Sequence, residues 1–368
     1  MGRSSVLLYI PTPSQKKFVT ELISKPDQDL SGFVPVQKLF ILGLFFRLKE
    51  DLEDNHNFYP FISRLVYEIK YLHGTLSLLK PSEKVISILI TQNLTGITTL
   101  NLDRIDRVRF CQLIGKTPNL QTLRIRGSTL DNVINLEGLL DKTPLLSTLC
   151  LQFTTPTTGK LKPLLKKLPS LCHFILRGYT FTSEELSLLP PLITLSFSKV
   201  KLPQANDWVE LIRRNQPTLE HLRLKKIALY PQRDLVEAII KCSQLISLCI
   251  RIKDFGSGLS NSLFQVLLKN NSFLESIFLE DLVQLSDFSL TSLAEFGAQI
   301  RNIRLFQTSI TREPMTVFAN KFMQRKTAEY IIITGITTII RNNSTTKISS
   351  DTTSLSLWYR GYNLKKLE

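Results

Sequence analysis

The sequence predicts an α/β fold in which a short strand and a helix alternate many times along one chain. A pattern of apolar residues at positions 1, 4 and 6, written L-x-x-L-x-L, recurs nine times at intervals of 21 to 29 residues. A proline stands shortly before five of these nine hexapeptides, and segments with the apolar spacing of a helix separate them. A regular period of this length is typical of a solenoid, because one strand and one helix cannot bury their apolar faces alone.

The strands are predicted at the nine hexapeptides. Alternation along an extended chain places positions 4 and 6, such as Leu222 and Leu224, on one face of each strand. Those residues are expected in the core, and positions 3, 5 and 7 are expected on the opposite face. The hexapeptides begin at Ile97, Leu120, Leu146, Leu171, Leu192, Leu219, Leu245, Leu274 and Ile300.

Helices are predicted between the strands. Trp208, Leu211 and Ile212 share one side of such a helix, and charged residues occupy the other side. Proline after a helix restricts the residue before it and helps to end the helix. Thr182 and Glu185 have the spacing of a capping box at another helix start. The spacing predicts helices over residues 132–142, 207–215, 233–241 and 260–270.

This repeat resembles that of the leucine-rich repeat family, in the helix-bearing subclass of about 26 residues found in F-box/leucine-rich proteins. The segment 286–305 is the most similar, because it carries the helix, the turn at Gly297 and the next strand. The resemblance covers roughly residues 85–310 and implies a curved solenoid, with a parallel sheet lining the concave face and helices on the convex face. The family's Asn or Cys after the strand is missing, so the hydrogen bonding of the turn is expected to differ; Ile105, Ser128 and Phe153 stand in that place.

The two ends of the chain do not fit the repeat. Residues 1–84 have helical spacing at 15–23 and 36–53, and two interpretations stay open. The segment is either a helical cap over the end of the core, or a diverged F-box-like segment that docks on the adaptor of a cullin-type ubiquitin ligase. Residues 301–368 carry eleven Lys and Arg against four acids, and residues 311–368 are predicted to form a basic C-terminal cap, with a strand-like run at 330–340.

The composition limits the class of protein. The chain has 46 Lys and Arg against 31 Asp and Glu, and its net charge of +15 favours acidic partners, nucleic acid among them. Five cysteines without C-x-x-C spacing indicate buried thiols in a reducing compartment rather than disulfides or a zinc site. The most apolar runs are shorter than the ~20 residues that cross a bilayer. The sequence therefore predicts a cytoplasmic or nuclear protein with no membrane contact.

The sequence carries no motif of a catalytic site. Gly115-Lys116-Thr117 matches the last three residues of the phosphate-binding motif G-x-x-x-x-G-K-[ST]. Phe110 stands where that motif requires its first glycine. The patterns G-x-S-x-G and H-E-x-x-H are missing, and the four histidines are too dispersed to predict a metal site. We therefore expect no enzymatic activity, no cofactor and no metal.

The face predicted to lie opposite the core is basic. Positions 3, 5 and 7 of the nine repeats give 27 residues, of which seven are Lys or Arg, where the chain average predicts about three, and two, Asp103 and Glu280, are acidic. Phe278 and Phe306 are the only aromatic residues among them, which argues against stacking on single-stranded nucleic acid. The alternative is a solvated face with no ligand of its own. The candidate partner-binding residues are Arg124, Arg126, His173, Arg177, His221, Arg223, Lys225, Arg251 and Arg304.

These features predict a non-catalytic protein-recognition scaffold. Clustered arginines on a rigid sheet suit a carboxylate or phosphate, so an acidic or phosphorylated protein is the expected partner. The resemblance to F-box/leucine-rich proteins implies the more specific role of a substrate receptor of a cullin ubiquitin ligase. The alternative is a structural subunit of a large ribonucleoprotein or chromatin assembly, in which the positive charge contacts phosphates.

Overall fold

The structure is a computed structural model that divides into two compact units, Met1–Ser170 and Leu171–Glu368. In both units strands and helices alternate and the strands pair in parallel, which confirms the predicted α/β leucine-rich repeat solenoid. The residues that it describes are 13–24, 60–61, 74–79, 83–91, 94–103, 107–127, 141–158, 161–204, 206–227, 232–252, 258–325 and 330–335.

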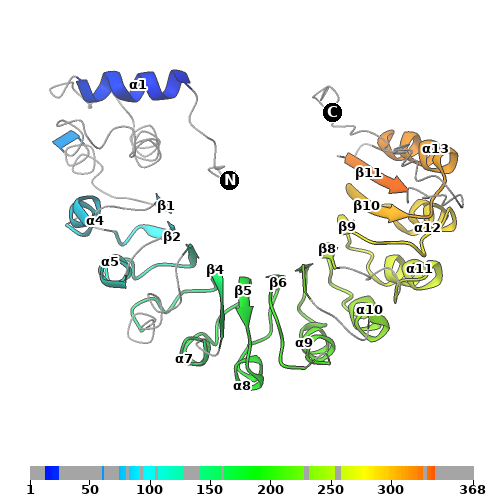
Figure 1. Cartoon of the computed structure of the whole chain (residues 1–368), viewed down its shortest axis with the longest axis horizontal. Helices are drawn as coiled ribbons and strands as arrows, with labels where there is room; N and C mark the ends of the chain where they lie inside the picture. Colours follow the sequence, from blue (N-terminus) through cyan, green and yellow to red (C-terminus); the bar gives the residue numbers. More distant parts are fainter. Residues whose placement is uncertain are drawn as a thin grey trace, which may run out of the picture. The chain divides into compact units, whose positions relative to one another are not determined.

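The first unit contains parallel strands in the order β1-β2-β3-β4 (Figure 1). Its strands are β1 (Gly74–Leu79), β2 (Ile97–Asp103), β3 (Thr122–Arg126) and β4 (Thr148–Thr158). Its described helices are α1 (Pro13–Ser24), α4 (Glu83–Ile90), α5 (Arg107–Ile114) and α7 (Lys162–Lys166).

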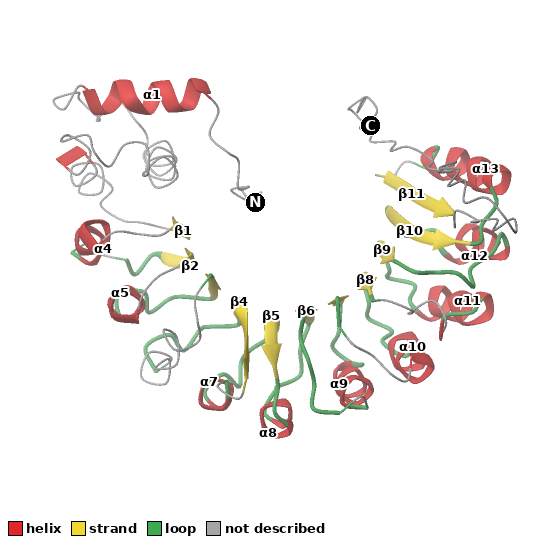
Figure 2. Ribbon diagram, in the orientation of Figure 1, coloured by secondary structure: helices red, strands yellow, loops and turns green. Residues whose placement is uncertain are grey.

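The second unit contains parallel strands in the order β5 to β11, with its helices on one side of the sheet (Figure 2). The strands are β5 (His173–Thr180), β6 (Thr194–Ser198), β7 (His221–Lys225), β8 (Ser247–Arg251), β9 (Ser276–Leu279), β10 (Asn302–Thr308) and β11 (Tyr330–Gly335). The described helices are α8 (Ser183–Ser187), α9 (Asp207–Asn215), α10 (Gln232–Ile240), α11 (Asn261–Asn270), α12 (Phe288–Phe296) and α13 (Arg312–Met323).

The core lies between the strands and the helices. Every residue at positions 1, 4 and 6 of the nine predicted hexapeptides is at most 2% exposed, as predicted from the alternation. Trp208 of α9 is also buried and meets Phe197 of β6 edge to face, with ring centroids 6.0 Å apart. Burial of each large apolar side chain contributes about 1.5–3 kcal/mol to stability. One strand–helix unit buries these side chains only against its neighbours, so it is stable only when they cover it.

The helices agree with the expectations from spacing where they are described. The segment 207–215 is helical as predicted, and α10 and α11 begin within one residue of the predicted starts. Thr182 and Glu185 form the predicted capping box at the start of α8. The helix expected over 36–53 lies outside the described residues, and so does the helix expected over 132–142 except for 141–142, which form a turn.

The turn after the strand is closed by the backbone instead of the missing Asn or Cys. At position 8 of six repeats, which follows the strand or, in β5 and β10, lies among its last residues, the backbone is left-handed, with φ between 51° and 75°. The N–H of Lys226 donates to the carbonyl of Arg251 at 2.8 Å, and that of Lys199 donates to the carbonyl of Lys225 at 2.9 Å, so these two turns are tied to the next strand. The six residues are Gly127, Gly178, Lys199, Lys226, Asp281 and Gln307.

The parallel sheet extends one strand beyond the predicted repeat region at each end. β1 lies before residue 85 and pairs with β2, and β11 lies after residue 310 and pairs with β10. The segment 1–84 is therefore not helical throughout, because β1 belongs to the sheet. The strand-like run at 330–340 does contain a strand, and the helix expected over 15–23 lies within α1. None of the described helices has the length and apolarity to span a membrane.

Candidate binding surface on the inner face

The inner face is defined here as positions 3, 5 and 7 of the repeats, on the side of the strands opposite the helices. Adjacent strands from β5 to β9 pair in register, so residues at the same position form rows across the sheet. Lys225 of β7 is opposite Arg251 of β8, and Phe278 of β9 is opposite Arg304 of β10. Side chains of one row on adjacent strands lie about 4.8 Å apart, which is close enough for them to interact.

The structure places all nine candidate residues on this face. Arg124 and Arg126 lie on β3 of the first unit and are exposed. The other seven lie on the second unit, where they are exposed or half-buried, on four of its strands: His173 and Arg177 on β5, His221, Arg223 and Lys225 on β7, Arg251 on β8, and Arg304 on β10. Their role in binding stays a prediction.

Three cations, Arg223, Lys225 and Arg251, form what we call the basic cluster. The nearby charge of Arg251, partial burial and Arg223 lower the pKa of Lys225 from its ordinary value of 10.5, in that order of importance. The neighbouring row positions on β6 are Ser196 and Ser198, whose short side chains leave the cluster uncovered on that side. The cluster therefore concentrates positive charge on an accessible part of the sheet.

Two aromatic rings lie beside the basic cluster. The rings of Phe278 and Phe306 are tilted against each other with centroids 5.5 Å apart. The guanidinium carbons of Arg251 and Arg304 lie 5.1 Å and 5.6 Å from the centroid of Phe278. Sequence reasoning found both aromatic residues but gave them no binding role, because it could not foresee that the arginines contact the ring of Phe278.

Glu280 is the one carboxylate among the inner-face residues of β7–β10. It forms an ion pair with Arg251, and both side chains are about one-third exposed. The pair holds the guanidinium of Arg251 beside the ring of Phe278. Of the three cations of the basic cluster, Glu280 pairs directly with Arg251, and its charge also partly offsets the lowering of the pKa of Lys225.

The two histidines lie on either side of Thr194. Nδ1 of His173 and Oγ1 of Thr194 share a hydrogen bond of 2.8 Å. Burial first, and His221 second, lower the pKa of His173 from its ordinary value of 6.5, and Glu220 raises it in part. His173 is therefore mostly neutral at pH 7 and adds little to the positive charge there.

The described cysteines are free thiols, and Cys150 and Cys242 are buried. Burial raises the pKa of Cys242 to about 12, and it also raises the pKa of Cys150 and Cys249. These three thiols stay protonated at neutral pH and are poor nucleophiles. Within the described residues, no group of three or more His, Cys, Asp or Glu could hold a metal ion.

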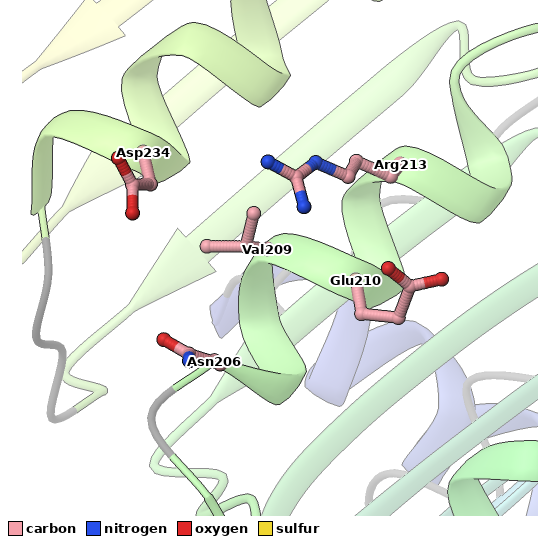
Figure 3. Close-up of a pocket in the computed structure, with 5 residues that line it drawn as sticks. All are labelled: Asn206, Val209, Glu210, Arg213 and Asp234. Carbon is pink, nitrogen blue, oxygen red and sulfur yellow. The ribbon is translucent and has the colours of Figure 1, made fainter.

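A small open pocket lies on the helix side of the second unit, between α9 and α10 (Figure 3). Carboxylates and a guanidinium line it together, so it has no dominant charge. Sequence reasoning did not single it out, and it contains none of the nine candidate residues. Its lining residues are Asn206, Val209, Glu210, Arg213 and Asp234.

Comparisons with known proteins find similar folds only. No family model matches the chain, and no curated protein matches significantly. Among solved structures, an internalin, InlF from Listeria monocytogenes, has 16% sequence identity and a TM-score of 0.40, over 79% of this chain and 97% of that chain. A chain in the structure of the Rad7 and Elc1 complex in yeast has 14% identity and a TM-score of 0.43, over 84% and 85% of the two chains. The function of this chain therefore has to be inferred from its own side chains.

Proposed function

We propose that the chain is a non-catalytic protein-recognition scaffold whose inner face binds an acidic or phosphorylated segment of a partner. The observation that carries this proposal is the basic cluster of Arg223, Lys225 and Arg251. These cations occupy neighbouring rows of a regular parallel sheet, and Glu280 is the one carboxylate in those rows between β7 and β10.

The geometry suits an oxyanion. An arginine guanidinium forms paired hydrogen bonds with a carboxylate or a phosphate, and a lysine adds a compact charge. A bound anion also relieves the repulsion that lowers the pKa of Lys225. Because the strands are held in register by their neighbours, the backbone that carries the cations is preorganised, and binding has to order only their side chains.

Charge reversal tests this site. We expect Arg223→Glu and Arg251→Glu each to weaken binding of a fluorescent phosphoserine peptide about tenfold or more, and to reduce the salt dependence of the affinity. Lys241→Glu makes the same change of net charge after α10 and is the matched control. Fluorescence anisotropy at several salt concentrations measures both effects. Equal affinities for the three variants would contradict the proposed site.

We further propose that residues 1–84 dock on the adaptor of a cullin ubiquitin ligase, which would make the chain an F-box-type substrate receptor in the cytoplasm or nucleus. Within this segment, α1 has Val19, Leu22 and Ile23 buried and Phe18 exposed to 40%. Phe18→Asp in the full chain is expected to abolish recovery of the adaptor from native cells and to leave peptide binding unchanged. Glu21→Gln, on the same helix, is the control. Failure of the unaltered chain to recover the adaptor would refute this role.

The second candidate is a structural subunit of a ribonucleoprotein or chromatin assembly. The net charge of +15 favours it, since such charge contacts phosphates without a specific site. In this case the chain co-purifies with nucleic acid that is lost at raised salt or after nuclease treatment. Recovery of the ligase adaptor without nucleic acid would contradict this candidate.

A further inference from the structure

The inner face between β7 and β10 has two chemically different ends. The basic cluster occupies β7 and β8, and the aromatic pair Phe278 and Phe306 occupies β9 and β10 (strands of the second unit, Figure 2). A partner that needed only negative charge would have no use for the aromatic end. The partner is therefore expected to carry a group that contacts the aromatic end as well as a negative charge.

The aromatic end is fixed and half-exposed. Guanidinium groups lie on the ring of Phe278 from two neighbouring strands, at 5.1 Å for Arg251 and 5.6 Å for Arg304. Phe306 supports the ring at 5.5 Å, and the side chains of both phenylalanines remain partly open to solvent. Such cation–π contacts hold the ring in one orientation, so it offers an apolar surface of defined position.

The distance between the two ends follows from the register. From Arg223 to Phe278 there are two strand spacings, and from Lys225 to Phe306 there are three, which gives roughly 10–14 Å at about 4.8 Å per strand. An extended peptide rises about 3.3 Å per residue. Groups about three to four residues apart in an extended segment therefore reach both ends.

We infer that the inner face of β7–β10 binds an extended protein segment that carries a phosphorylated or acidic side chain and an aromatic residue about three to four positions from it. This inference rests on the proposed function and defines its ligand. The phosphate or carboxylate contacts the basic cluster, beside the short side chains of Ser196 and Ser198. The aromatic residue of the partner packs against Phe278 and Phe306, where Arg304 borders it.

The same face is poorly suited to a nucleic acid strand. A phosphate backbone needs a continuous track of cations, and in the row of Lys225 and Arg251 the next two residues are the carboxylate Glu280, paired with Arg251, and the aromatic Phe306. A protein segment with one anionic side chain avoids this carboxylate. The observations therefore favour a protein ligand, and an oligonucleotide serves as the competing ligand in the test.

The test uses the full chain and a series of fluorescent peptides. Each peptide contains one phosphoserine and one phenylalanine in a glycine–serine background, separated by one to six positions and in either order. We expect the affinity measured by anisotropy to be highest at a separation of three or four, about tenfold above that of the peptide without phenylalanine. The gain from phenylalanine is expected to persist at high salt, where the phosphate contribution weakens.

Two variants separate the two ends. Phe278→Ala is expected to remove the preference for spacing and the gain from phenylalanine, and to leave phosphate-dependent binding. Phe278→Leu keeps an apolar side chain and is expected to retain part of the gain, which covers the case that the alanine variant folds poorly. Phe273→Ala removes an exposed phenylalanine outside the inner face, 58% exposed, and is the matched control.

The outcomes distinguish the inference from the proposed function. If the phosphoserine peptide binds and phenylalanine at any spacing has no effect, the two-ended ligand is wrong and the basic site stands. If no phosphopeptide binds at low salt, both fail together. Tighter binding of a single-stranded oligonucleotide, lost in Phe278→Ala, would also overturn the inference, because the aromatic pair would then stack on bases.

Discussion

The two faces of the same strands follow opposite rules. On the face toward the helices, every repeat places an apolar side chain at the same positions, and the differences between repeats are small. On the inner face, the row from Arg223 to Arg304 contains a cation, a thiol, an aromatic ring and another cation. The first face specifies the fold, because each repeat must cover the next, and the second face is free to specify a partner.

A pair of neighbouring substitutions on β7 gives the largest test of this difference. Leu224→Ala is expected to lower the free energy of unfolding by about 3 kcal/mol, because Leu224 is fully buried and a cavity remains. Arg223→Ala changes the next side chain, which is exposed, and is expected to change stability by no more than about 0.5 kcal/mol. Urea denaturation followed by circular dichroism measures both. Similar losses in the two variants would contradict the separation of roles.

The left-handed residues at position 8 of the repeats provide a second comparison. Gly178 and Lys199 occupy the same position 8 with φ of 73° and 53°. Gly178→Ala is expected to cost about 1 kcal/mol, because an L-residue is strained in the left-handed region. Lys199→Gly is expected to stabilise by about 0.5 kcal/mol, since the relieved strain of about 1–2 kcal/mol exceeds the entropy cost of glycine.

Thermal unfolding of both variants, together with Lys201→Gly as a control at a nearby exposed position outside the left-handed turn, measures these shifts. A stabilised Gly178→Ala would show that the turn relaxes to another conformation. A destabilised Lys199→Gly would show that the lysine side chain contributes more than the strain removes.

The buried face could be predicted from the sequence. The hexapeptide pattern does not include β1 and β11, because each of them lacks the required large apolar residue at position 1. β1 has apolar Leu76 and Leu78 at positions 4 and 6, but His73 stands at position 1. β11 has Ile331 and Ile333 at those positions, but Ala328 stands at position 1. The hexapeptide, which requires all three positions, therefore includes neither strand, and β11 is predicted only as the strand-like run at 330–340; positions 4 and 6 alone, at the same period, include both strands.

The turn and the inner face could be predicted only in part. Glycine signals the left-handed turn at Gly127 and Gly178, but Lys199 and Lys226 adopt it without any such signal. The hexapeptide alignment places Phe278 opposite Arg304 in one row, yet alignment alone does not show that the guanidinium lies on the ring. Row membership follows from the backbone period, whereas side-chain contact depends on rotamers that have no period.

Glu280 offers a test of the inner face by itself. Glu280→Gln removes the carboxylate that pairs with Arg251 and keeps its shape. We expect phosphopeptide affinity to rise about threefold, because a partly screened repulsion of roughly 0.6 kcal/mol is removed. Glu275→Gln, whose carboxylate pairs with Arg301 outside the rows of the inner face, is the control. Unchanged affinity in Glu280→Gln, measured by anisotropy, would mean that the bound anion lies away from Arg251.

The smallest expected effect concerns His173 and the pH dependence of stability. Burial, and then the nearby His221, lower the pKa of His173 in the folded chain below 6.5, its ordinary value. Between these two pKa values the unfolded chain binds more protons than the folded chain, so stability falls as the pH decreases through that interval. His173→Gln is expected to make this part of the pH dependence shallower, and His221→Gln to do so less, since His221 is the second cause of the shift.

Urea denaturation between pH 5 and 8 measures the slope for each variant, and NMR titration of the His173 ring measures its pKa directly. An unchanged slope in His173→Gln, or a pKa of His173 above 6.5, would contradict the expected sign. The effect is confined to the inner face because Thr194, the hydrogen-bond partner of His173, lies in the same row. A change at this position therefore alters the charge of the binding surface at low pH while the apolar face of β5 keeps its packing.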